Sequence, residues 1–178
     1  MGLVINIILT AIALTTFAIA GGYITNAAVR ITGIPEYQSA NQDLVSAHKW
    51  ASIAAVVTWI SIALLIVGIV LYIIFAFESV ELTGKFFIYA LLFLALTGNI
   101  VVGILSALTA SDINKSGVPD NNLSYRQSII AAVLAIVTFV FILVTLILTF
   151  VYKPKIKKKS GEIVPGWITE NIGMLGEF

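Results

Sequence analysis

The stretch WASIAAVVTWISIALLIVGIVLYIIFAF, residues 50–77, contains no Asp, Glu, Lys, Arg or His. Three further stretches share this property: 1–29, 86–111 and 127–152. A helix needs about 20 apolar residues, each rising 1.5 Å, to cross a hydrocarbon core about 30 Å thick. Each stretch is long enough to span a membrane, and we place the first span at about 3–29. We therefore predict an all-α polytopic membrane protein whose four transmembrane helices form an antiparallel bundle.

The composition of the whole chain supports this prediction. Of the 178 residues, 60% are hydrophobic and 11% are charged, and the mean hydropathy is +1.06, whereas soluble domains carry roughly 25% charged residues. The connections between the spans are short: 30–49, 78–85 and 112–126. Ser124 and Gln127 have the spacing of a capping box for the fourth helix. We divide the chain into a transmembrane domain, residues 1–152, and a basic tail, residues 153–178.

The tail determines the predicted orientation, because Lys and Arg that flank the spans are retained on the cytoplasmic side. It begins with five lysines: Lys153, Lys155, Lys157, Lys158 and Lys159. With Lys85, these give the face that holds both termini six positive charges. The opposite face has four, from Arg30, Lys49, Lys115 and Arg126. We therefore expect both termini on the cytosolic side.

The tail also has features of a binding segment. Near a membrane surface each lysine gains about 1 kcal/mol from anionic lipid, so the lysine run is expected to contact anionic headgroups or an acidic partner. The distal part, GEIVPGWITENIGMLGEF, residues 161–178, mixes apolar residues with glycines, and Trp167 is its large aromatic before Phe178. This pattern is typical of a peptide that docks on a protein. We predict that Trp167 is a partner contact.

Small and polar residues recur every four positions within three of the spans. The clearest row lies in the third span and consists of Ala95, Asn99, Gly103 and Ala107. Shorter rows are Ala47, Ala51, Ala55 and Ala18, Gly22, Asn26. Helices in lipid associate where small residues let backbones approach and a polar group bonds across the contact. We interpret the rows as helix-packing faces, with Asn99 contributing about 1 kcal/mol of interhelical bonding; the alternative is that Asn99 lines a pore.

The spans offer little chemistry. Ionisable residues inside a bilayer usually mark ion paths, proton relays or substrate sites, and the four stretches contain none. The lone His48 cannot by itself form a two-histidine haem site or a three-ligand zinc site. We expect His48 to be an interfacial residue hydrogen-bonded in its loop; the alternative is a metal site shared with Glu36 and Asp43. With no nucleophile motif or phosphate loop, we expect no catalysis, cofactor or metal.

Three blocks of the chain are similar to small four-span membrane proteins of nucleocytoplasmic large DNA viruses. They are DLVSAHKWASIAAVVTWISIALLIVGIVLYIIF (43–75), LSALTASDINKSG (105–117) and YRQSIIAAVLAIV (125–137). The resemblance implies a component of the bilayer under an icosahedral capsid, which tethers minor capsid proteins to the membrane. It implies no catalytic residues.

We therefore predict a non-catalytic structural protein of a virion internal membrane, with both termini on the cytosolic or capsid-facing side. Its expected partners are the lipid bilayer and other membrane or capsid proteins, with no nucleic acid or small-molecule substrate. One alternative is a channel or transporter subunit that oligomerises so that Asn99 and Thr97 line a shared pathway. Another is a cellular four-span scaffold protein.

Overall fold

The computed structural model describes residues 2–39, 41–77, 82–119, 122–151, 156–157 and 163–164. The helices of this described part are α1 (Gly2–Ile31), α2 (Pro35–Gln38), α3 (Gln42–Phe77), α4 (Leu82–Lys115) and α5 (Leu123–Val151). Two short strands, β1 (Ile156–Lys157) and β2 (Ile163–Val164), pair antiparallel. The predicted all-α bundle of four long helices is confirmed.

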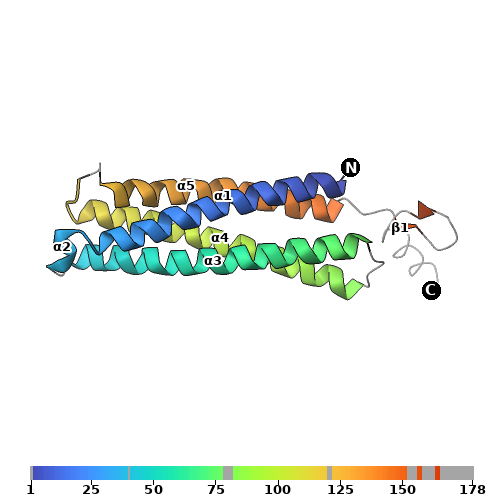
Figure 1. The fold of residues 1–178 in the computed structure, drawn as a ribbon, viewed down its shortest axis with the longest axis horizontal. Helices are drawn as coiled ribbons and strands as arrows, with labels where there is room; N and C mark the ends of the chain where they lie inside the picture. Colours follow the sequence, from blue (N-terminus) through green and yellow to red (C-terminus); the bar gives the residue numbers. More distant parts are fainter. Residues whose placement is uncertain are drawn as a thin grey trace, which may run out of the picture.

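The four long helices lie side by side in one bundle (Figure 1). α1 packs against α3 and α5, and α4 packs against the same two helices. Because the chain reverses direction at each connection, every neighbouring pair is antiparallel. The start of α1 therefore lies at the same end of the bundle as the end of α5, and α2 lies at the opposite end (Figure 1).

Three helices, α3, α4 and α5, begin earlier than their charge-free stretches, and an asparagine caps two of them, α3 and α5. The Oδ1 atom of Asn41 accepts hydrogen bonds from the backbone N–H groups of Asp43 (3.0 Å) and Leu44 (3.4 Å) at the start of α3. The Oδ1 atom of Asn122 accepts one from the N–H of Ser124 (2.8 Å) at the start of α5. Such side-chain acceptors satisfy N–H groups that have no partner within the helix. The cap of α5 is therefore Asn122, and the expected capping role of Ser124 is wrong.

On each long helix, one series of buried residues recurs at alternating spacings of three and four, and other buried residues lie beside it. On α1 they are Asn6, Thr10, Ala13, Phe17, Ala20, Ile24, Ala27 and Ile31. On α4 they are Ile88, Leu92, Ala95, Asn99, Val102, Ser106, Thr109 and Ile113. The same spacing runs through α3 from Leu44 to Gly68 and through α5 from Ser124 to Thr145. This is the heptad repeat of coiled coils, in which side chains of one helix fit between those of its neighbour.

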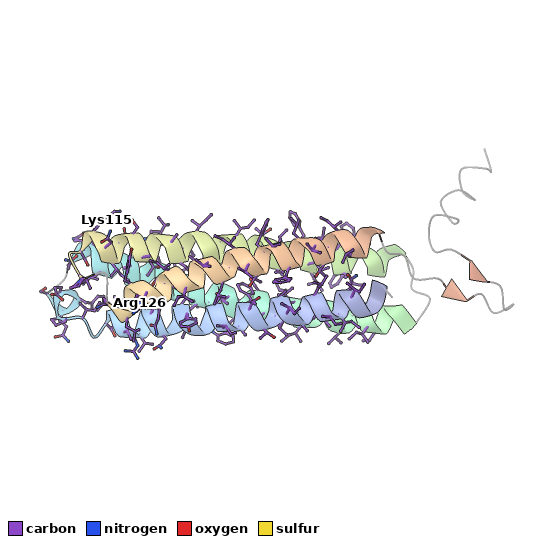
Figure 2. The ribbon with its side chains drawn as sticks, turned by 90° about the horizontal axis from the view of Figure 1, so that it is seen from above. Lys115 and Arg126 are labelled. Carbon is purple, nitrogen blue, oxygen red and sulfur yellow. The ribbon has the colours of Figure 1, made fainter. Side chains whose placement is uncertain are left out.

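Many large apolar residues point out of the bundle, along all four long helices (Figure 2). Ile8, Val56, Phe93 and Ile136 are each more than half exposed, whereas alanine, serine and threonine are frequent inside. Soluble proteins bury their large apolar residues. Four helices are long and apolar enough to cross a membrane: Ile5–Ile31, Gln42–Leu71, Phe86–Lys115 and Leu123–Leu148. The fold is that of an integral multi-pass membrane protein.

Candidate functional site

The small-residue row predicted for the third span lies on α4 and is only partly buried. Ala95 and Asn99 are buried, Gly103 is half-buried and Ala107 is exposed. A step of four residues turns a helix about 40° further than one full turn. The row therefore winds off the packed face, and the heptad continues through Ser106 instead. Ala107 is not a packing residue of this bundle.

The row predicted for the first span is wrong. Gly22 and Asn26 are exposed, and a Cβ built on Gly22 would have no atom within 4 Å. The packed glycine is Gly21, where a Cβ would lie 2.8 Å from the Thr58 side chain of α3. Both glycines stand in equally apolar sequence, so composition did not distinguish them. On α3, in contrast, all three predicted residues are buried: Ala47, Ala51 and Ala55.

Asn99 lies inside the bundle with 1% of its surface exposed. Neither its Oδ1 nor its Nδ2 atom has a hydrogen-bond partner among the described residues. The interhelical bond expected of Asn99 is not formed in this structure.

Thr97, the second residue of the expected shared pathway, lies on a different face of α4 from Asn99. Its side chain is exposed, and its hydroxyl donates to the carbonyl of Phe93 (2.9 Å). Because Asn99 is buried and Thr97 faces outward, the two side chains do not line one pathway in this chain.

Close contacts between helices occur near the middle of the bundle. A Cβ added to Gly98 of α4 would overlap the hydroxyl of Ser61 of α3. The hydroxyls of Thr16 on α1 and Thr138 on α5 lie 2.9 Å apart, within hydrogen-bonding distance. Small residues thus allow the backbones to approach, as is usual for helices that associate in lipid.

A small cavity lies nearer the end of the bundle that holds the start of α1 and the end of α5. Its volume is about 10 Å³. The residues that line it are Asn6, Ile7, Thr10, Gly68, Ile69, Ile88, Leu92 and Thr145. This cavity was not predicted from the sequence. A usable signal was the spacing of the polar residues, since Thr138 and Thr145 lie one heptad apart and Asn6 and Thr10 fit the same repeat.

His48 lies in α3 and not in the loop where it was expected. Its Nδ1 atom is 3.0 Å from the carbonyl oxygen of Ala28, in the last turn of α1. A carbonyl oxygen only accepts, so Nδ1 carries the hydrogen, and His48 satisfies one of the carbonyls left open at a helix end. The Tyr37 ring meets His48 edge-on at 5.6 Å. Groups of three or more His, Asp or Glu side chains that could hold a metal are absent from the described residues.

The four positive charges counted for the face opposite the termini all lie at the α2 end of the bundle. Lys115 and Arg126 stand there at the end of α4 and the start of α5 (Figure 2). Lys115 pairs with Asp112 at 3.1 Å, Arg30 donates to the Oδ1 atom of Asn26 at 3.3 Å, and the Lys49 ammonium lies 5.6 Å from the Trp50 ring centre.

The predicted tail contacts lie largely outside the described residues. These are Lys153, Lys155, Lys158, Lys159 and Trp167. Lys157 belongs to β1, where its backbone pairs with Ile163.

Comparisons with protein-family models, curated proteins and solved structures found no match to this chain. Its function is therefore argued from its own residues and fold.

Proposed function

We propose that this chain is a non-catalytic structural membrane protein that works as one subunit of a larger assembly. The observation that carries the proposal is the nature of the bundle interior. The buried polar side chains of the described residues are all neutral Asn, Gln, Ser and Thr. Proton relays and ion paths across a membrane usually depend on ionisable side chains. An interior of apolar and small neutral polar side chains that pack closely is instead suited to holding four helices together.

The more specific form of the proposal is a component of a virion internal membrane that tethers the capsid shell to the bilayer. The similarity of blocks 43–75, 105–117 and 125–137 to four-span proteins of large DNA viruses supports it. The arrangement of the helices also supports it, because the start of α1 and the end of α5 lie at the same end of the bundle (Figure 1). The basic tail can then lie along headgroups while its distal part meets a protein on that same side.

Deleting residues 161–178 tests the tether. The five lysines remain, so insertion and orientation should survive while association with partner proteins fails. The measurement is the set of proteins that co-purify with the full chain and with the deletion variant from particles or infected membranes. Trp167→Ala should weaken the same association about thirtyfold, because a buried aromatic anchor often contributes 2 kcal/mol or more.

Replacing the five lysines with Gln is the matched control. The remaining positive charges then favour the opposite face, so orientation should change although residues 161–178 are intact. Unchanged partners after the distal deletion would contradict the tether and leave the lysine run as a topology anchor. An ion conductance of reconstituted liposomes would support the alternative, a channel or transporter subunit.

A further inference from the structure

We propose that the outer side of α1, from Arg30 inward to Gly22, binds one anionic phospholipid. The inference is independent of the proposed function and of the orientation of the bundle, because it concerns only the leaflet at the α2 end. It begins with three exposed residues, Gly22, Asn26 and Arg30. Residues four positions apart are neighbours on a helix surface. The three therefore follow one another down the outside of α1, from the membrane surface inward.

Arg30 supplies a positive charge at the membrane surface. It follows the uncharged stretch 1–29 directly and lies in the last turn of α1. Its Nε atom donates to the Oδ1 atom of Asn26 at 3.3 Å, and it forms no ion pair among the described residues. A guanidinium carries several N–H donors in a planar fork that matches phosphate geometry. The remaining N–H groups of Arg30 can therefore bind a phosphate of the headgroup layer.

Asn26 offers a second donor about 6 Å further into the membrane. Arg30 Nε only donates, so the atom of Asn26 that it meets is the amide oxygen. The amide Nδ2 group donates to no described residue, and Asn26 is exposed. In a phospholipid the glycerol ester carbonyls, which only accept, lie directly below the phosphate. The two polar side chains thus match the two polar layers of the lipid.

The surface below Asn26 is apolar and open. Gly22 lies about 12 Å inward from Arg30, and a Cβ built on Gly22 would have no atom within 4 Å. Trp59 of α3 lies at a similar depth, about 15 Å beyond Lys49, and is 51% exposed. Its indole Nε1 donates to the Oγ1 atom of Thr25 at 3.4 Å, which holds the ring against α1 near Gly22. An acyl chain can lie on Gly22 beside this ring.

The position of Trp59 is unusual and supports a lipid contact. Lipid-facing tryptophans are concentrated at the two membrane surfaces, whereas Trp59 lies well inside the uncharged stretch 50–77 and faces outward. Its polar N–H group is satisfied by Thr25 and not by the headgroup layer. The indole is therefore free to present its apolar face to a chain at this depth.

Charge selects an anionic phospholipid as the occupant. Because Arg30 has no acidic partner among the described residues, the site has a net positive charge and favours a headgroup with a net negative charge. The other possible occupant is α1 of a second copy. Copies inserted in the same orientation would bring the two Arg30 side chains toward each other, and like charges in an interface are unfavourable.

Quenching of Trp59 fluorescence by brominated lipid measures the binding. The full chain with Trp50→Phe and Trp167→Phe keeps Trp59 as its one tryptophan. It is reconstituted in mixtures of phosphatidylglycerol and phosphatidylcholine, with bromine on the acyl chains of one lipid at a time. Phosphatidylglycerol should bind beside Trp59 about fivefold more tightly, the gain expected for one anionic lipid near one Arg.

Arg30→Gln should reduce this preference to about onefold. Arg126→Gln is the matched control, because Arg126 is also exposed at the α2 end, but the next turn of its helix presents Ile130 and not an amide. The preference should survive Arg126→Gln. Its loss in both variants, or in Arg126→Gln alone, would overturn the proposal, since it would show a general attraction to the positive charges of this end.

A second pair of variants tests the acyl-chain contact without changing charge. Gly22→Leu adds a side chain where there is open space, so it should leave the fold intact, displace the lipid and reduce the preference to less than twofold. Ala11→Leu, at an exposed position of the same helix, should leave it near fivefold. Two further results would overturn the proposal. One is equal binding of the two lipids by the chain with Arg30 and Gly22 intact. The other is a Trp59 that neither brominated lipid quenches, which would show that a second copy covers this side of α1.

Discussion

At the scale of single residues, the polar side chains inside the bundle fall into two groups, those with a hydrogen bond within their own helix and those without. Most hydroxyls donate to the carbonyl four residues earlier in their own helix, as Thr58 does to Ala54. This bond is local and needs no neighbouring helix. Asn99 makes no such local bond, and both of its polar atoms lack a partner among the described residues. The sequence therefore identified Asn99 as a polar residue within a span, but it did not show whether a hydrogen-bond partner lies opposite it.

We expect Asn99→Leu to stabilise the bundle. Leucine has the same branched shape as asparagine, and removing two buried atoms that lack partners should relieve about 1–3 kcal/mol. Thermal or denaturant unfolding in bicelles measures the change, with Thr97→Val on the exposed face of α4 as the control. A loss of stability in Asn99→Leu would mean that the amide is hydrogen-bonded in the membrane, as predicted from the sequence.

At the scale of the helix, the spacing of the buried residues is 3.5 and not 4. The difference between the two spacings is too small to matter between the first two members of the row, so Ala95 and Asn99 are both buried. It has accumulated by the fourth member, so Ala107 is exposed. A strict seven-residue repeat is typical of left-handed supercoiled helices, the commonest arrangement in transmembrane bundles. Small residues beside this series also allow close approach, as Gly98 of α4 does against Ser61 of α3.

Substitutions at two alanines of the predicted row distinguish the 3.5-residue spacing from the four-residue spacing. Ala95→Leu places a large side chain at a position with no exposed surface and should destabilise the bundle by about 1–3 kcal/mol through overpacking. Ala107→Leu makes the same change on the same helix at an exposed position and should be tolerated. Unfolding in bicelles compares the two variants. Equal destabilisation would indicate that a second helix packs on Ala107, as the four-residue row predicts.

At the scale of the whole molecule, the even number of long helices brings the start of α1 and the end of α5 to one end of the bundle (Figure 1). Arg30, Lys49, Lys115 and Arg126 lie near the other end, with α2. The orientation of the bundle in a membrane depends on which group of positive charges is retained in the cytoplasm. The five tail lysines alone outnumber the four positive charges of the other end, and Lys85 brings their face to six.

Limited proteolysis of sealed vesicles whose cytosolic face points outward tests this orientation. The protease should remove the tail and leave the connections 30–49 and 112–126 intact, because those lie on the lumenal side. Detergent should then expose both connections to cleavage, which provides the control. Cleavage between Arg30 and Lys49 in sealed vesicles would show that the bundle has the reverse orientation.

The sequence alone determined the number of long helices and their antiparallel order, because span length and charge are properties of each segment by itself. Residues 50–77 are long and uncharged wherever they pack, and four such stretches with short connections leave few arrangements. Only the tertiary structure decided which face of each helix is buried, which is why Gly21 and not Gly22 contacts Thr58. It also brought together Asn6, Thr10 and Thr145 from the two ends of the chain. The physical reason is that lipid and protein interior are both apolar, so hydrophobicity does not distinguish the inner face from the outer one. Packing distinguishes the two faces, because it depends on the size of each side chain and its fit against a neighbouring helix.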